Sequence, residues 1–270
     1  MLSVRPAAVA GMFYPEAPAA LVAQVHACLG KAAVASTAGN RPRALIVPHA
    51  GYVYSGPIAG LAYQRLAEHA DEIQRVVLFG PTHRAAVQGL ALPTVQAFAT
   101  PLGIVEIDAE AAALALTLSQ VRKSDAAHAL EHSLEVQLPF LQTVLRRFRI
   151  VPFAVGSASA AQVAEVIELL WKDPGTLVVV SSDMSHYHRY SEARTLDRAT
   201  ADSILALSAT LQGEQACGAT PINGLLVAAR HRGLCPELID LRNSGDTAGD
   251  KSRVVGYASF AFAEVGHDRS

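Results

Sequence analysis

The clearest strand pattern in the chain is TLVVV at Thr176–Val180, and a polar segment, SSDMSH, follows it at Ser181–His186. Two other apolar runs have the same character, ALIV at Ala44–Val47 and RVVLF at Arg75–Phe79. These runs are continuous rather than alternating, which is typical of strands buried on both faces, as in parallel sheets covered by helices. The three segments therefore predict the centre of such a sheet.

Longer helical patterns lie between the strand patterns along the whole chain. We expect helices at about 17–29, 57–70, 108–122, 134–147, 158–172, 192–210 and 222–232, and further strands at 150–155, 237–241 and 253–262. Strands that alternate with helices of this length favour an α/β fold. No segment reads as an interdomain linker, so we predict one layered domain over residues 1–270, with a mostly parallel central sheet flanked by helices.

Composition excludes several classes of protein. The 270 residues carry 22 Lys+Arg and 24 Asp+Glu, a formal net charge of -2, which gives no electrostatic reason to expect nucleic acid or an anionic membrane as a partner. The start of the chain lacks a signal-peptide pattern, and no apolar run reaches the ~18 residues of a membrane helix. Three cysteines far apart, Cys28, Cys217 and Cys235, do not form a disulfide framework. We therefore expect a cytoplasmic protein.

Each of the three buried strand patterns is followed by a histidine. His49 comes two residues after the first run, His83 four residues after the second, and His186 six residues after the third. In open α/β sheets, ligands bind beyond the carboxyl ends of the strands. If the three strands are neighbours, the imidazoles converge, and clustered histidines are the usual basis of a metal or acid–base centre.

Glu131 and His132 form a second candidate group, just before an expected helix that starts near Leu134. Ser133 is placed to cap that helix, which would leave Glu131 and His132 in the preceding loop, where they can reach a site. Capping by Ser133 and lining of a site remain equal alternatives at this stage. The order of the residues is not H-E-x-x-H, so the zinc-protease mechanism has no support.

Cys217 differs from the other two cysteines because it lies in a tight loop that opens the helix expected at Ile222. A thiol near a helix N-terminus is expected to have a lowered pKa, which favours the thiolate that metals and electrophiles require. Cys28 lies in an apolar helical pattern typical of a core residue, and Cys235 has no partner pattern. Cys217 is therefore the candidate reactive thiol.

The chain resembles the Memo family, called AmmeMemoRadiSam system protein B in bacteria and archaea. The ordered motifs that carry the resemblance are VAGMFYP at 9–15, PHAGYVYSG at 48–56, GPTH at 80–83, EHSLEVQLPFL at 131–141, SSDMSH at 181–186 and Cys217-Gly218. The match extends from about residue 5 to residue 262. Each motif is short, but the ordered set is specific.

The resemblance implies a LigB/Memo-like fold, similar to the class III extradiol dioxygenases, which are non-haem iron enzymes with two histidine ligands and one carboxylate ligand. It implies that His49, His83 and Cys217 are metal ligands, that His186 is the acid–base histidine and that Asp183 lies beside it. Cys217 stands where the dioxygenases use a carboxylate. Two imidazoles and one thiolate suit Fe(II), copper or zinc, and the resemblance makes Fe(II) the first expectation.

Three functions remain open from the sequence. The first is a non-haem iron (or copper) redox protein, dioxygenase-like, with an unknown small-molecule or peptide ligand. The second is a metallohydrolase in which His186 or Glu131 is the base. The third is a non-catalytic adaptor or ligand-binding protein that acts with radical-SAM and AMMECR-type proteins, as the family's name implies. Tyr52 and Tyr54, together with Glu131 and His132, are expected to line the pocket.

Overall fold

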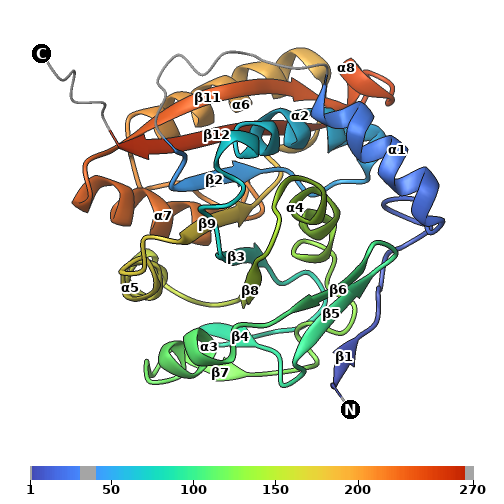
Figure 1. The fold of residues 1–270 in the computed structure, drawn as a ribbon. Helices are drawn as coiled ribbons and strands as arrows, with labels where there is room; N and C mark the ends of the chain where they lie inside the picture. Colours follow the sequence, from blue (N-terminus) through green and yellow to red (C-terminus); the bar gives the residue numbers. More distant parts are fainter. Residues whose placement is uncertain (1, 31–40, 265–270) are drawn as a thin grey trace, which may run out of the picture.

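The computed structural model describes residues 2–30 and 41–264, and a large mixed sheet forms its centre (Figure 1). The strands of this sheet follow the order β10-β12-β2-β9-β3-β8-β4-β7, and β11 pairs with β12 outside that path. The pairs β2–β9, β9–β3 and β3–β8 are parallel, whereas β12 and β4 join the parallel core in antiparallel orientation. The predicted fold class, a layered α/β domain with a mostly parallel core, is confirmed.

The bounds of the elements follow. The strands are β1 Val4–Arg5, β2 Ala44–Val47, β3 Arg75–Pro81, β4 Leu90–Leu92, β5 Ala97–Thr100, β6 Gly103–Glu106, β7 Val121–Lys123, β8 Arg149–Val155, β9 Thr176–Ser181, β10 His186–His188, β11 Leu234–Asn243 and β12 Val254–Glu264. The helices are α1 Pro18–Leu29, α2 Tyr52–Gln64, α3 Ala109–Ala115, α4 Leu138–Val144, α5 Ala160–Leu170, α6 Tyr190–Leu205, α7 Ala219–His231 and α8 Ser244–Thr247, with short 3-10 turns η1 Ala67–His69 and η2 Glu135–Gln137.

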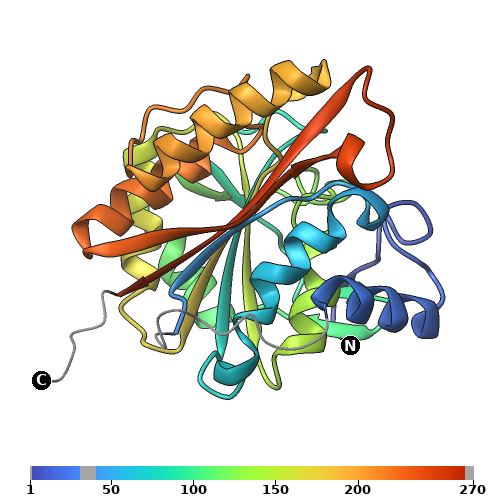
Figure 2. The same cartoon turned by 90° about the horizontal axis from the view of Figure 1, so that it is seen from above.

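Helices cover both faces of the central sheet. Figure 2 shows the strands between α1 and α2, in blue and cyan, and α6 and α7, in orange. Alternate strand residues belong to different cores: Ile46 packs in the core of α5 and α7, whereas Leu45 packs in the core of α1, α2 and α4. All four residues of β2 and all six of β9 are buried. The continuous apolar runs are therefore explained by burial on both faces.

The three strands that precede histidines are direct neighbours. β9 lies between β2 and β3 and runs parallel to both, with Val180 opposite Ile46 on one side and opposite Phe79 on the other. Parallel strands end at the same edge of the sheet, so the segments that follow them begin side by side. This arrangement brings residues 48–49, 82–83 and 182–186 to one edge.

A second, three-stranded sheet, β1-β5-β6, lies at the lower right in Figure 1 and includes the start of the chain. Arg5 at the end of β1 is 5% exposed, and its guanidinium contacts the fully buried carboxylate of Glu135 at 2.6 Å. The same guanidinium donates to the backbone carbonyls of His128 and Glu131. Arg5 therefore fixes the segment 128–135 from outside the main sheet.

Two of the expected helices are shorter than the pattern indicated. The expected helix 108–122 ends at Ala115, because the chain then forms β7 beside β4. The expected helix 134–147 consists of η2 and the seven-residue α4. The capping alternative for Ser133 is wrong: its hydroxyl donates to the carbonyl of Pro81, and no side chain caps the turn that follows. Among the described residues, no helix is long and apolar enough to cross a membrane.

Replacing Arg5 with methionine should lower the free energy of unfolding by about 3–5 kcal/mol, because the buried Glu135 carboxylate would lose its counter-charge. Equilibrium denaturation by urea measures the change. The matched control is Arg146→Met, whose partner Asp71 is 78% exposed, and this variant should unfold almost like the wild type. Equal effects of the two substitutions would contradict the role given to Arg5.

Candidate metal centre

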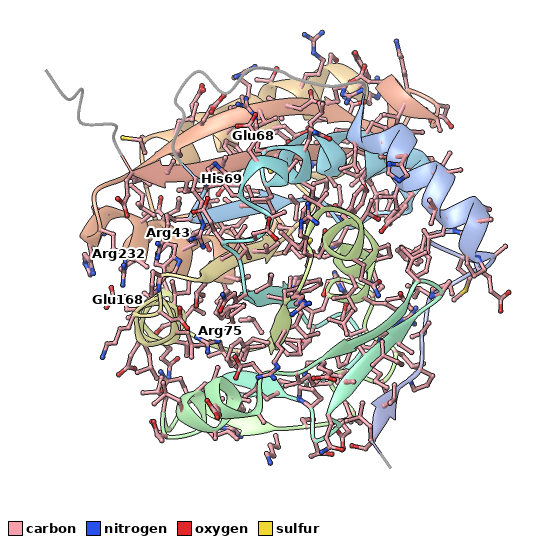
Figure 3. The ribbon with its side chains drawn as sticks, viewed as in Figure 1. Arg43, Glu68, His69, Arg75, Glu168 and Arg232 are labelled. Carbon is pink, nitrogen blue, oxygen red and sulfur yellow. The ribbon has the colours of Figure 1, made fainter. Side chains whose placement is uncertain are left out.

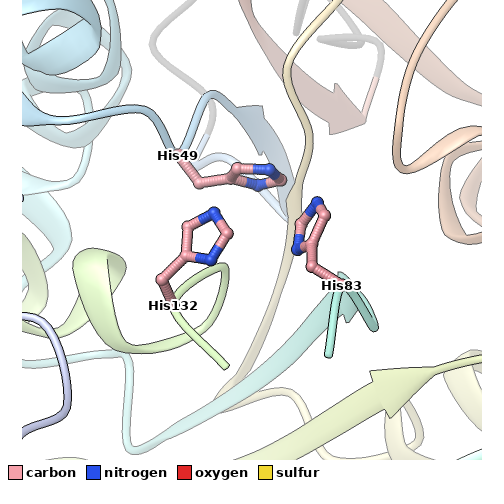
Figure 4. Close-up of side chains that lie close together, drawn as sticks. All are labelled: His49, His83 and His132. Atoms are coloured by element: carbon pink, nitrogen blue, oxygen red, sulfur yellow. The ribbon is translucent and has the colours of Figure 1, made fainter. Parts of the chain in front are cut away.

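Three histidines meet at the carboxyl edge of the parallel strands (Figure 4). One ring nitrogen from each of His49, His83 and His132 lies within 4.8 Å of the other two, so the group can hold a metal ion. The His49 ring stands nearly perpendicular to the other two, at centroid distances of 5.2 Å to His83 and 5.3 Å to His132. The convergence of His49 and His83 follows from the adjacency of their strands.

His49 is the buried member of the cluster, with 2% of its surface exposed. Its backbone N–H donates to the Asp183 carboxylate at 2.7 Å, and its Nδ1 lies 2.9 Å from the hydroxyl of Ser181, the last residue of β9. Burial and then the neighbouring His83 lower the pKa of His49 to about 3, so the imidazole is neutral at physiological pH. A neutral imidazole is the form that binds metals.

The hydrogen bonds around Ser181 determine the tautomer of His49. The Ser181 hydroxyl donates its one proton to the carbonyl of Ser133 at 2.6 Å, and it accepts from Nε2 of Gln137 at 2.8 Å. Gln137 cannot be reversed, because the same amide nitrogen also donates to the carbonyl of Pro48 while Tyr63 donates to the amide oxygen. Ser181 can therefore only accept from His49, so Nδ1 carries the proton and Nε2 keeps its lone pair.

Glu131 contacts Nδ1 of His83, as Ser181 contacts Nδ1 of His49. The carboxylate lies 2.9 Å from Nδ1 of His83, and it also accepts the backbone N–H groups of His83 and Ser133. Burial alone would raise the pKa of Glu131, but these hydrogen bonds outweigh it and lower the pKa to about 2. An ionised carboxylate accepts only, so Nδ1 of His83 is the donor and Nε2 is the nitrogen that can face a metal.

His132 forms a wall of the cluster. Its ring is stacked on His83 with centroids 4.6 Å apart, and Phe13 packs against it at the same distance. Nδ1 of His132 lies 3.4 Å from Glu131, which contacts His83 as well. Burial and then the charge of His49 lower the pKa of His132 to about 4. The sequence left the lining of a site by Glu131 and His132 open as one of two alternatives, and the structure puts both beside His83.

Cys217 lies against the same cluster. Its Sγ is 3.3 Å from Nε2 of His49, the nitrogen with the free lone pair, and 3.7 Å from the carbonyl of Asp183. Cys217 precedes Gly218, the residue before α7, as the sequence indicated. Gly218 is required there, because a Cβ would come within 2.7 Å of the Ser182 side chain and push the loop away from β9.

The lowered thiol pKa expected from the helix N-terminus is wrong for the metal-free protein. Burial, and next the charge of Asp183, raise the pKa of Cys217 to about 12. Removal from water disfavours the thiolate more than the first turn of a helix favours it. The thiol therefore needs a cation beside it to ionise, which a metal ion provides.

His186 and Asp183 occupy different positions at this edge. Asp183 is 5% exposed and accepts the backbone N–H groups of His49 and Ala50, so it supports the loop that carries His49. Burial raises its pKa, although these donors oppose the shift. His186 begins β10, is partly exposed and lies outside the three-histidine group. Its charge nevertheless acts on both His49 and Asp183, so it lies at the border of the site.

The two tyrosines expected to line a pocket differ in position. Tyr52 is 2% exposed, donates its hydroxyl to the carbonyl of Val136 and packs against Phe140 in the core. Tyr54, two residues later in α2, is 39% exposed and lies near Gly51. A hollow of about 600 Å³ opens on another side of the site and is lined by His83, Cys217, residues 81–88 and the first turn of α7.

No sequence pattern pointed directly to the supporting roles of Ser181 and Gln137. Ser181 reads as the end of a strand, and Gln137 reads as part of a helix near Leu134. Both face the site only because β9 lies between β2 and β3 and because η2 passes beneath Pro48. The one available signal was the position of Ser181, directly after the apolar run 176–180. The neighbouring strand, β2, ends at Val47, two residues before His49.

A family model for Memo-like proteins matches residues 5–261 of the chain. The chain belongs to the Memo family. A MEMO1 family protein of Methanopyrus kandleri is 38% identical over 280 residues, covering 96% of this chain and 98% of the relative. One of Aquifex aeolicus is 36% identical over 276 residues, covering 97% and 100%. The resemblance expected from the ordered motifs is therefore confirmed.

The Memo fold of this chain also resembles a solved structure with little sequence similarity. An uncharacterized protein from Escherichia coli K12 superposes with a TM-score of 0.55 at 15% identity, covering 81% of this chain and 99% of the other. At this identity the likeness shows the fold alone. It supports the layered α/β architecture and carries no argument about activity.

In the Memo-family chain, Ser181→Ala should release the tautomer of His49. Without the hydroxyl acceptor, Nδ1 loses its partner and the Nε2–H form becomes populated, which ¹⁵N-edited NMR of the metal-free protein detects. Metal affinity should fall by about 10–100-fold, the usual cost of losing such a supporting contact. The matched control is Ser133→Ala, which removes a buried hydroxyl that does not contact His49. A His49 ring that keeps Nδ1–H in Ser181→Ala would show that another group sets the tautomer.

Proposed function

We propose that this Memo-family protein is a metal-dependent redox protein that binds Fe(II) through His49, His83 and Cys217. The observation that carries the proposal is the contact of 3.3 Å between Sγ of Cys217 and Nε2 of His49, in a site where both histidines use Nδ1 for their supporting contacts. Two imidazoles and a thiolate suit iron, copper and zinc. A bound Fe(II) would supply a redox centre, and we propose it ahead of copper or zinc.

The assignment of Cys217 rather than His132 as the third ligand has a geometric basis. The rings of His83 and His132 are stacked at an interplanar angle of 29°, and Phe13 packs against His132 as well. The ring nitrogens of all three histidines lie within 4.8 Å of one another, so His132 is within reach of a metal as well. We propose that it is a wall that keeps His83 in position, because its ring is stacked on that of His83. The sulfur atom, in contrast, lies directly at the free nitrogen of His49.

The chain's own residues then have separate tasks. Ser181 and Glu131 orient His49 and His83, and Asp183 holds the backbone that follows β2. His186, at the border of the site, is the proposed proton carrier, and Asp183 supports it electrostatically. The hollow of about 600 Å³ beside His83 and Cys217 offers room for a small-molecule or peptide ligand.

A metallohydrolase on the same site is the second candidate, favoured by the three histidine nitrogens that would equally suit zinc. Glu131 is a poor base for that reaction, because its carboxylate is engaged by His83 and Ser133 and its pKa is lowered to about 2. A hydrolase would therefore use His186 as its base. Retention of zinc without oxygen uptake would favour this function over redox chemistry.

Elemental analysis after anaerobic purification tests the ligand set. We expect iron in the wild type, loss of more than about 100-fold in metal affinity in Cys217→Ala, and a smaller effect in His132→Ala, comparable to supporting contacts. Cys235→Ala is the matched control, since that thiol is exposed and belongs neither to the three-histidine group nor to the lining of the adjoining hollow. Loss of metal in His132→Ala with retention in Cys217→Ala would replace the proposed set by three histidines.

Oxygen uptake across catechol-like and peptide substrates tests the activity. Consumption of oxygen by the iron-loaded protein, and its loss in His186→Ala with metal content unchanged, would support the proton-transfer role. Full activity in His186→Ala would contradict it.

A further inference from the structure

A second hollow, of about 740 Å³, adjoins the border of the site at β10. It is lined by the segment Tyr187, His188, Arg189, Tyr190, Ser191 and Glu192 and by the loop before β12, Lys251, Ser252 and Arg253. None of these residues takes part in the metal centre as described above. The hollow begins one residue after His186, whose ring lies 5.8 Å from that of Tyr187.

The formal charge of this lining is positive, since it carries three basic side chains and one carboxylate, that of Glu192. Arg189, Lys251 and Arg253 contribute three cations, and within residues 2–30 and 41–264 none of them has an acidic partner within 4.0 Å. The one acidic side chain of the lining, Glu192, pairs with His188 at 3.2 Å. The nearby Asp250 carboxylate accepts from the hydroxyl and the N–H of Ser252.

Aromatic rings hold two of these cations in place. The Arg253 guanidinium lies 5.1 Å from the ring centroid of Tyr187, and the Lys251 ammonium lies 4.6 Å from that of Tyr190. A cation that rests on an aromatic face keeps its full charge and most of its N–H donors. The two cations therefore keep N–H donors available to a ligand.

The backbone at Tyr187 supports this interpretation. Its φ of 63° lies in the left-handed region, which a bulky side chain rarely adopts. Such a conformation persists only where surrounding contacts require it, and it is concentrated at functional sites. Here it turns the Tyr187 ring outward, 63% exposed, to the position where Arg253 stacks on it.

We propose that this hollow is an oxyanion-binding subsite that takes a carboxylate or a phosphate monoester group. Arg253 and Lys251 would donate to the anion's oxygens, with Arg189 adding charge at the rim. Because the hollow begins next to His186, it would hold the anionic end of a molecule whose other end reaches the three histidines. That last step rests on the proposed function, whereas binding of the anion itself does not.

Titration of the full-length, metal-free protein with phenyl phosphate and with benzoate tests the subsite. Calorimetry gives the affinities, and NMR of the Arg253 side-chain N–H and the Tyr187 ring locates the bound probe. In the double variant Lys251→Gln/Arg253→Gln, binding should weaken by at least about tenfold, since each charge-assisted hydrogen bond contributes that much. The preferred probe identifies the source of the oxyanion, phosphate or carboxylate.

Arg232→Gln is the matched control. Arg232, labelled in Figure 3, also stacks on an aromatic ring, that of Trp171 at 5.1 Å, but it follows the C-terminal end of α7, whereas Cys217 precedes the N-terminal end. This variant loses one positive charge, against two in the double variant, and should bind both probes like the wild type. Equal weakening in Arg232→Gln and in the double variant, or no saturable binding of either probe at millimolar concentration, would overturn the subsite.

The same titration on Cys217→Ala separates the two proposals. Unchanged probe affinity in that variant is expected, because Cys217 does not line the hollow. A failed metal assignment would therefore leave the subsite standing, and loss of probe binding in Cys217→Ala would contradict an independent subsite.

Discussion

The parallel pairing of β9 with β2 on one side and β3 on the other is the constraint on which the site depends. It brings the ends of three strands to one edge and puts Ser181 beside the loop that carries His49. A one-residue slip of β9 would turn the Ser181 side chain to the opposite face of the sheet, away from His49. The position of the Ser181 hydroxyl is therefore as firmly determined as the core itself.

Three buried carboxylates surround the site, and each is stabilised in a different way. Glu135 is paired with Arg5, Glu131 accepts from His83 and from backbone N–H groups, and Asp183 accepts backbone N–H groups only. Burial without such donors would be costly for each of them. The outcome for the pKa differs accordingly, since that of Glu131 is lowered to about 2 and that of Asp183 is raised. The acids therefore organise the loops, while the imidazoles and the thiol face the space where a metal fits.

The sequence pattern predicted the buried strands, the fold class and the adjacency of His49 and His83, because continuous apolar runs and strand-terminal residues are local signals. It did not reveal β4 to β7, whose short segments form strands only beside β8 and in the small sheet. The prediction of a lowered thiol pKa for Cys217 was wrong. Burial, which raises the pKa, depends on the whole fold, whereas a helix start is visible in the local sequence. The role of Gln137 was equally hidden, since its partners Pro48 and Ser181 are distant in sequence.

Arg5 has a consequence beyond the stability of the fold. Its guanidinium donates to the carbonyls of His128 and Glu131 and to the carboxylate of Glu135. It therefore binds the segment that carries His132 on both sides of that residue. The two-residue strand β1 thereby helps to position the histidine cluster, although it lies in a different sheet. A protein fused or trimmed near this strand would keep every residue of the cluster and still lose its alignment. Strand β1 thus contributes to the geometry of the histidine cluster, as do the strands that precede the histidines.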